Sequence, residues 1–297
     1  MKKKNQIHIG SYSVDVFLVL IMTLICIVMI YPFANIVAIS LSSSAQISTG
    51  SVTWLPKEFN IEGYKIVFGQ NDIWVAYKNT IIYAIVATAI NLFCTSMIAY
   101  SLMVKDFVLR KHITIFLLIT MFFNGGTVPT YLVISKLNLM NTMWALVLPN
   151  AISAYNVFVY RAFYKGISTE IREAARVDGA NERTILFKIY VPLSKALFAT
   201  FGLFSAVYIW NSYFEALLYI KDANKQPIQM ILRQVLFTSG ADGGTFDGVN
   251  EMVQNGVINP KNVQYACIVA TIGPILLVYP FIQKHFTQGM QIGAVKG

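Results

Sequence analysis

Residues 16–39 read VFLVLIMTLICIVMIYPFANIVAI, and this run contains no Asp, Glu, Lys or Arg. A helix needs about 20 apolar residues to cross a bilayer, and a charge near its centre is costly. The preceding Lys2, Lys3 and Lys4 would also suit a signal peptide. The apolar run is longer than a usual signal core, however, and no small-residue cleavage site follows it. We therefore expect an uncleaved membrane span.

The same apolar character recurs five times along the 297-residue chain. Four of these runs are free of charged residues, and the fifth contains only Glu215, near one end. Polar residues do not return at every third or fourth position, as they would on a water-soluble helix. The five further predicted spans are residues 79–104, 113–135, 137–160, 196–220 and 262–283.

The composition of the whole chain agrees with this pattern. Apolar residues make up 56% of the chain and charged residues 12%, and the mean hydropathy is +0.58. Ordinary globular chains carry about 25% charged residues, so this chain has too little charge to cover a water-facing surface. A disordered chain would need low hydrophobicity and high charge. We predict an all-α polytopic membrane protein in which residues 1–297 form one transmembrane domain with six transmembrane helices.

Basic residues are unevenly distributed among the loops between these runs. If the N-terminus is cytoplasmic, 15 of the 23 Lys and Arg residues lie on the inner side and 8 on the outer side. Cytoplasmic loops of membrane proteins carry an excess of Lys and Arg. We therefore expect both termini in the cytoplasm and the long loops 40–78 and 221–261 outside. The net charge of +9 follows from this bias, and no basic cluster interleaved with aromatic residues indicates a nucleic-acid partner.

The predicted inner loop, about 166–192, carries the most informative motif. Residues 168–181 read STEIREAARVDGAN. The leading Ser or Thr can cap a helix, Gly179 can end that helix, and Asn181 can cap a second one that Pro192 ends. This pattern predicts two short helices joined by a turn. By spacing alone, the pair fits a docking site for a partner protein and a simple amphipathic connector equally well.

This loop resembles the EAA loop of the membrane subunits of binding-protein-dependent ABC importers. The residues that carry the resemblance are Glu173, Ala174, Ala175, Gly179, Ile189 and Pro192. Val191 is a mild departure, because the family usually has Leu before this Pro. The position of the loop after the fourth of six runs is also similar to that in the carbohydrate-uptake permeases of the type I fold.

Three further motifs resemble the LplC-like subgroup of these permeases, which is used for complex oligosaccharides and polysaccharides. They are NGG at 124–126 with PTY at 129–131, LMNTMWA at 139–145 and WNSYFEA at 210–216. The resemblance therefore extends over most of the chain.

The resemblance implies a set of partners and no covalent chemistry by this chain. Two permease subunits, this chain and a second homologous one, would form the pathway in the bacterial cell membrane. Two cytoplasmic ATPases would bind ATP and Mg, and an extracellular solute-binding protein would deliver the sugar. The chain itself has no G-x-x-x-x-G-K-[ST] phosphate loop. The residues implied in docking to the ATPase are Glu173, Ala174, Ala175, Asp178, Gly179 and Ala180.

A sugar route needs hydrogen-bonding groups and flat rings inside the membrane, where polar side chains face a cavity or another helix. For any single residue, the alternative is a hydrogen bond between helices, and the sequence favours that alternative. Glu215 differs, since an ionisable group in a span usually has a partner or a wet cavity. The candidates are Asn91, Asn150 and Tyr155, and, as the selected pathway residues, Asn156, Trp210, Asn211, Tyr213 and Glu215.

Two other functions are alternatives on the residues alone. A secondary transporter would need paired ionisable residues near the midplane, and one intramembrane carboxylate fits this poorly. An integral membrane enzyme for glycan or lipid transfer would need acidic or His clusters at a membrane face, but His8, His112 and His285 lie far apart in sequence. The three cysteines occur singly in apolar runs. We therefore expect no metal site and no cofactor bound by this chain.

Overall fold

The computed structural model describes residues 9–238, 246, 252–253, 255 and 257–294, and every regular element among them is helical. The chain divides into two compact units. One comprises Met1–Gln70 with Gln234–Thr271, and the other comprises Asn71–Arg233 with Ile272–Gly297. Several residues of the predicted outer loop 221–261 and the basic residues at both termini lie outside the described residues.

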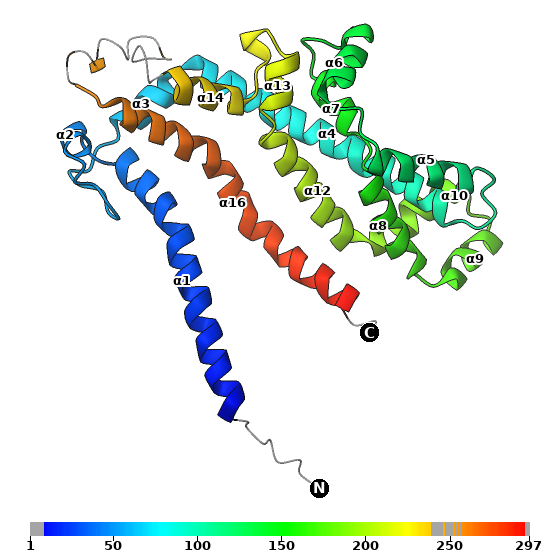
Figure 1. The fold of residues 1–297 in the computed structure, drawn as a ribbon. Coiled ribbons are helices and arrows are strands. Elements are labelled where there is room, and N and C mark those ends of the chain that lie inside the picture. Colours follow the sequence, from blue (N-terminus) through cyan, green and yellow to red (C-terminus); the bar gives the residue numbers. More distant parts are fainter. Residues whose placement is uncertain (1–8, 239–245, 247–251, 254, 256, 295–297) are drawn as a thin grey trace. The chain divides into compact units, whose positions relative to one another are not determined.

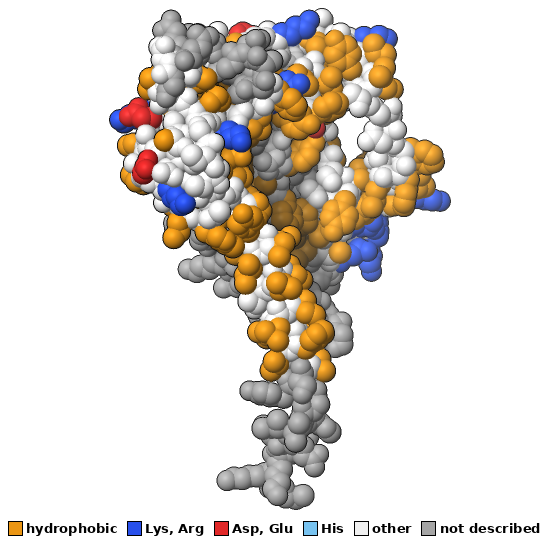
Figure 2. All heavy atoms as spheres, turned by 60° about the vertical axis from the view of Figure 1, so that its left-hand side comes forward, with side chains coloured by type: hydrophobic (Ala, Val, Ile, Leu, Met, Phe, Trp, Pro, Cys, Tyr) orange, Lys and Arg blue, Asp and Glu red, His pale blue; other side chains and the backbone are white. Residues whose placement is uncertain are grey.

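The first unit contains α1 (Ile9–Ser40), α2 (Ser44–Ser48), α3 (Glu62–Gly69) and the start of α16 (Pro260–Ala294). Helix α1 confirms the helix predicted at 16–39. None of its most apolar stretch is buried, and hydrophobic side chains cover its surface (Figure 2). Such a helix is stable only where its apolar side chains are out of water, as they are in a bilayer.

A buried amide holds the elements of the first unit together. The last carbonyls of a helix have no partner within it. Asn262 Nδ2 donates to the carbonyl oxygens of Ile39 and Ser40, both at 3.2 Å, and to that of Ser42 at 3.1 Å. Helix α3 approaches so closely that a Cβ at Gly63 would lie 2.1 Å from Asn262 Oδ1. Only glycine fits at this position.

The second unit is organised around α4 (Asn71–Met103). Helices α8 (Ala154–Lys165) and α12 (Lys195–Trp210) pack along it (Figure 1). Helix α4 confirms the helix predicted at 79–104 and begins eight residues earlier, inside the predicted outer loop. The other helices of residues 104–238, apart from the predicted inner loop, are α5 (Arg110–Phe122), α6 (Thr127–Lys136), α7 (Trp144–Val147), η1 (Leu148–Asn150), α13 (Phe214–Tyr219), η3 (Ala223–Lys225) and α14 (Ile228–Thr238).

Three of the predicted spans are interrupted and do not form single continuous helices. Residues 113–135 form α5 and α6, separated at 123–126, where Gly126 has a φ of +84°. The run 137–160 opens with turns, since Asn138 and Asn141 have positive φ, and breaks again between η1 and α8. The run 196–220 breaks between α12 and α13. Asn, Gly and Pro favour such non-helical conformations, although the flanking residues are apolar.

Three helices among the described residues are long and apolar enough to cross a membrane. Their spanning parts are Val14–Ser40, Asn71–Met103 and Pro260–Val278. A fourth crossing results if Glu182–Leu193 and Lys195–Trp210, which meet at an 84° bend, are taken as one span. The count of six spans stays a prediction.

Polar side chains satisfy the backbone at these breaks. No water is available in the hydrocarbon region, so irregular backbone there needs partners from the protein. Asn91, in the middle of α4, donates from Nδ2 to the carbonyl oxygens of Asn150 at 3.0 Å and Ala151 at 3.4 Å. In the break after α5, the Gly126 N–H donates to Asn124 Oδ1 at 2.8 Å. For Asn91, the interhelical hydrogen bond considered as the alternative to a pathway role is therefore present.

Candidate functional site

The predicted inner loop begins with a capped and exposed helix, α9 (Thr169–Val177). Ser168 Oγ accepts a hydrogen bond from the Glu170 N–H at 3.3 Å and so caps the helix start. Gly179 ends the helix with a φ of +82°, a conformation that other residues adopt only with strain. Its N–H donates to Arg176 O at 3.0 Å, and the Ala180 N–H donates to Ala175 O at 2.9 Å. These two bonds form a Schellman motif, which confirms the predicted helix stop.

A second, longer helical segment follows the turn. Asn181 Oδ1 accepts from the Thr184 N–H at 2.8 Å and caps α10 (Glu182–Ile185), as predicted. The chain then continues through a π-helix, η2 (Leu186–Tyr190), and α11 (Val191–Leu193). Pro192 therefore lies one residue before the helix end rather than at it. The 84° bend to α12 follows at Ser194.

The six predicted coupling residues divide between two faces of this loop. Ala175 and Ala180 are partly buried and pack against the core around Tyr164. The exposed coupling residues are Glu173, Ala174, Asp178 and Gly179. They therefore lie on a surface that is open to a partner.

Two exposed apolar residues on this surface were missed from the sequence. Val177 is 88% exposed and Ile171 is 41% exposed. Together with Ala174 they recur at intervals of three, which places them on one side of the helix. This spacing in the sequence could have identified Ile171 and Val177 as part of the exposed surface.

On the other side of α9, the carboxylate of Glu182 binds residues of both α9 and α4. Arg172 donates to the Glu182 carboxylate from Nη2 at 2.6 Å and from Nε at 3.3 Å. The Tyr100 hydroxyl, near the end of α4, donates to the same carboxylate. Partial burial raises the pKa of Glu182, but the hydrogen bonds from Arg172 and Tyr100 outweigh it and hold the pKa below its ordinary value. Sequence analysis did not identify this cluster, because its members are far apart in the chain.

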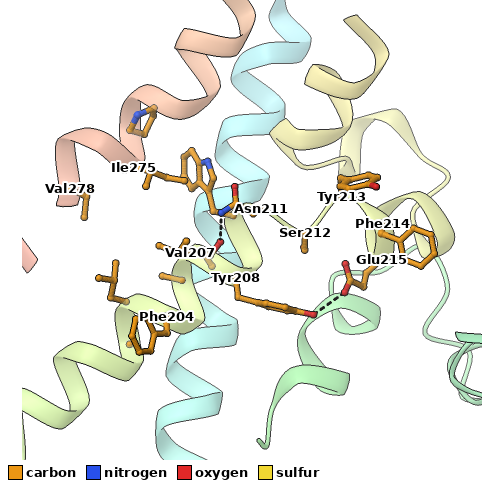
Figure 3. Close-up of a pocket in the computed structure, with 16 residues that line it drawn as sticks. Phe204, Val207, Tyr208, Asn211, Ser212, Tyr213, Phe214, Glu215, Ile275 and Val278 are labelled. Atoms are coloured by element: carbon orange, nitrogen blue, oxygen red, sulfur yellow. Dashed lines mark hydrogen bonds between the residues drawn. The ribbon is translucent and has the colours of Figure 1, made fainter. Parts of the chain in front are cut away.

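A cavity of about 850 Å³ lies in the second unit, near the break between α12 and α13 (Figure 3). Four of the five predicted pathway residues line it, namely Trp210, Asn211, Tyr213 and Glu215. The other lining residues include Ala84 of α4, Phe204, Tyr208 and Phe214, and Pro274, Ile275 and Val278 of α16. The structure therefore brings these four predicted residues together around one space.

Glu215 has both of the features expected of an ionisable group in a span. Its Oε1 accepts a hydrogen bond from the Tyr208 hydroxyl at 2.9 Å, and its side chain lines the cavity (Figure 3). Tyr208 was not among the predicted pathway residues. The signal for it was that an ionisable group in a predicted span needs a partner.

The aromatic rings at the cavity differ in how much of their surface they offer. Tyr208 is 50% exposed and Tyr213 47%, whereas Trp210 is only 9% exposed. The two tyrosine rings can therefore receive the flat face of a ligand, while Trp210 mainly packs inside the unit.

The remaining two of the five selected pathway residues, Asn211 and Asn156, make hydrogen bonds within the structure. Asn211 Nδ2 donates to Val207 O at 3.0 Å, and its Oδ1 accepts from Gln229 Nε2 at 3.2 Å. Asn156 does not line the cavity but lies in the first turn of α8, where its N–H donates to Ser153 Oγ at 3.4 Å. Within the described part of the chain, no three His, Cys, Asp or Glu side chains are grouped so that they could hold a metal ion.

The long apolar helices define the chain as a membrane-embedded protein, with broken helices around a cavity and an exposed two-helix loop. Residues 73–292 match the family described as "Binding-protein-dependent transport system inner membrane component". This match covers more than half of the chain, and the chain belongs to this family. It is thus a translocation subunit rather than an enzyme, which decides against the membrane-enzyme and secondary-transporter alternatives.

Similar proteins support the family membership over nearly the whole chain. The chain is 41% identical over 268 residues to Protein LplC of Bacillus subtilis (strain 168), covering 90% of each chain. It is 36% identical over 278 residues to the polygalacturonan/rhamnogalacturonan transport system permease protein YtcP of the same organism, covering 94% of this chain and 95% of YtcP. A solved bacterial ABC transporter involved in the import of the acidic polysaccharide alginate has a similar chain. That comparison has a TM-score of 0.88 and 29% identity, and covers 94% of this chain and 98% of the other.

Proposed function

We propose that this chain is the membrane-spanning subunit of an ATP-driven importer that moves an oligosaccharide or polysaccharide fragment into the cytoplasm. The names of YtcP and of the alginate importer support this substrate class. The observation that carries the proposal is the exposed, capped helix α9 with its glycine turn, because it offers a fixed surface to a partner.

Energy for transport comes from two cytoplasmic ATPase subunits, which hold ATP and Mg. The exposed stripe of Ile171, Ala174 and Val177 contributes the apolar contact with the ATPase, and Glu173 and Asp178 add charge beside it. Ala174 has only a methyl side chain and Gly179 has none, and both allow close approach. Ala175 and Ala180 keep the helix seated on its own core.

The other partners complete the path across the bacterial cell membrane. A second homologous permease lies beside this chain, and an extracellular solute-binding protein delivers the sugar. The excess of Lys and Arg in the predicted inner loops supports cytoplasmic termini.

The cavity near α13 lies on the sugar route. Tyr208 and Tyr213 offer ring faces for stacking, and Glu215 accepts hydrogen bonds from sugar hydroxyls. Trp210 and Asn211 support the wall. Asn156 stays a predicted pathway residue that lies apart from this cavity.

The test is ATP-dependent uptake by the complete complex reconstituted in proteoliposomes. Glu173→Lys and Gly179→Asp should abolish uptake and weaken ATPase association without affecting membrane insertion. The first reverses a charge on the docking surface, and the second forces a side chain onto a left-handed turn. The matched control for the charge reversal is Glu62→Lys on α3. The matched control for the glycine substitution is Gly50→Asp, because Gly50 lies in the predicted outer loop and also has a positive φ, +67°. Both controls should retain uptake. Normal uptake in both loop variants would contradict the coupling role.

A further inference from the structure

The carboxylate of Glu182 joins three elements of the second unit. Arg172 of α9 binds both of its oxygens, and the Tyr100 hydroxyl of α4 donates to Oε2. Glu182 itself begins α10. Arg176, one turn after Arg172, brings its Nε to 3.9 Å from Oε1. One carboxylate is thus the meeting point of the coupling helix, the following helix and the central helix.

Apolar packing alone holds α9 weakly. The side chains of the turns around it that pack against the core are those of Ile167, Ala175 and Ala180, and two of these are single methyl groups. The Arg172 side chain is only 15% exposed, whereas that of Glu182 is 47% exposed. The Arg172 guanidinium is mostly withdrawn from water and has the Glu182 carboxylate as its charged partner.

Two routes lead from this carboxylate towards the cavity. One passes through Tyr100 into α4, whose Ala84 lines the cavity about 24 Å away along the helix at 1.5 Å per residue. The other passes along residues 182–193 and through the 84° bend into α12, which also lines the cavity. Glu182 is therefore connected, through α4 and through α12, to two of the elements that line the cavity.

We propose that Glu182 is a positioning residue that transmits movement of the coupling helix α9 to α4 and α12, and that it does so without contacting the ATPase. The inference rests on the proposed function. Helix α9 receives the displacement on its exposed side, and Glu182 passes it on from the opposite side.

The experiment measures sugar imported per ATP hydrolysed by the complete complex in proteoliposomes, together with ATPase association. Glu182→Gln keeps the shape of the side chain but removes its charge. It should retain association and ATP hydrolysis, while the amount of sugar imported per ATP falls at least about fivefold. The reversed pair, Glu182→Arg with Arg172→Glu, should recover most of the loss, which a purely structural defect would not show. Tyr100→Phe should lower the ratio by about twofold, since one of the three donors is lost.

The matched control is Glu62→Gln, which breaks an exposed ion pair of similar length, 2.7 Å to Lys65, on α3. Its ratio should equal that of the unchanged protein. A normal ratio in Glu182→Gln would overturn the inference. Loss of ATPase association in Glu182→Gln would also overturn it, because Glu182 would then belong to the docking surface, while the proposed function, tested at Glu173, would stand. If Glu182→Gln does not accumulate in the membrane, a normal ratio in Tyr100→Phe overturns the inference instead.

Discussion

Helix α4 passes through two regions of the second unit that differ in how closely their side chains pack. Near Ala84, residues of α4, α12, α13 and α16 line a cavity, and the rings of Tyr208 and Tyr213 there are about half exposed. Around Tyr100, the rings of Tyr160, Tyr164 and Tyr190 form a closed cluster, with centroid distances from 5.1 to 6.5 Å. All three of these tyrosines are fully buried.

The difference fits what each region has to do in the proposed function. A substrate route must change its width, and open packing with half-exposed rings allows this at low cost. A coupling region must move as one body, and a dense aromatic core has few alternative arrangements. The same helix thus borders an open cavity in one region and a closed aromatic cluster in the other.

Matched aromatic truncations test this contrast most strongly. Tyr164→Ala should lower the free energy of unfolding by about 3–5 kcal/mol, because it leaves a cavity in a closed core. Phe204→Ala, at a ring that is 49% exposed beside the cavity, should cost less than about 1 kcal/mol. Denaturant unfolding of the purified chain in detergent measures both changes. Equal losses would show that the two regions are packed alike.

A functional contrast of intermediate size concerns the cavity rings. Tyr213→Ala should raise the KM for sugar uptake about tenfold, equivalent to ~1.4 kcal/mol, while ATPase association stays unchanged. Tyr155→Ala removes a similarly exposed tyrosine of α8 that does not line the cavity, and it should leave KM unchanged. Initial uptake rates over a range of sugar concentrations give the comparison. An equal rise of the KM in both variants would contradict the proposal that sugar passes through the cavity.

The smallest expected effect is the pH dependence of the Glu182 cluster. Since the pKa of Glu182 is held below its ordinary value of 4.5, its stabilising contribution is full above that pH. The contribution is lost as the pH falls through the lower pKa of the folded state. The unfolding midpoints of the unchanged protein and Glu182→Gln should therefore differ near neutral pH and converge in acid. The difference should stay below about 1 kcal/mol because the pair is partly exposed. A difference that widens on acidification would contradict the assignment.

The sequence predicts those parts of the fold that depend on local chemistry. The apolar run of α1, the Ser168 cap and the left-handed turn at Gly179 are each encoded within a few residues, and all three are present. The helix breaks were less accessible, because their flanking residues are apolar enough to span. Asn124 with two glycines, and Pro149 with Asn150, were the available signs that the backbone would open there.

Site residues were predicted where they lie together in one sequence motif. They were missed where residues far apart in the sequence come together only in the fold. Trp210, Asn211, Tyr213 and Glu215 line one cavity, and they are neighbours in the chain. In contrast, Tyr100 and Glu182 are 82 positions apart, and only the packing of α10 beside α4 brings them together. A single sequence carries no information on such a pairing.

The π-helix between Leu186 and Tyr190 has a consequence for how this segment tolerates change. A π-turn holds one residue more than the regular turn around it, so it is equivalent to an α-helix with a single inserted residue. Deleting one residue there would allow an unbroken α-helix and would leave the apolar composition almost intact. Because the wider turn already absorbs the extra residue, the deletion would leave Glu182 in nearly its present orientation relative to Tyr100. This segment therefore tolerates the loss of one residue better than a regular α-helix does, in which a deletion turns the flanking residues by about 100° relative to each other.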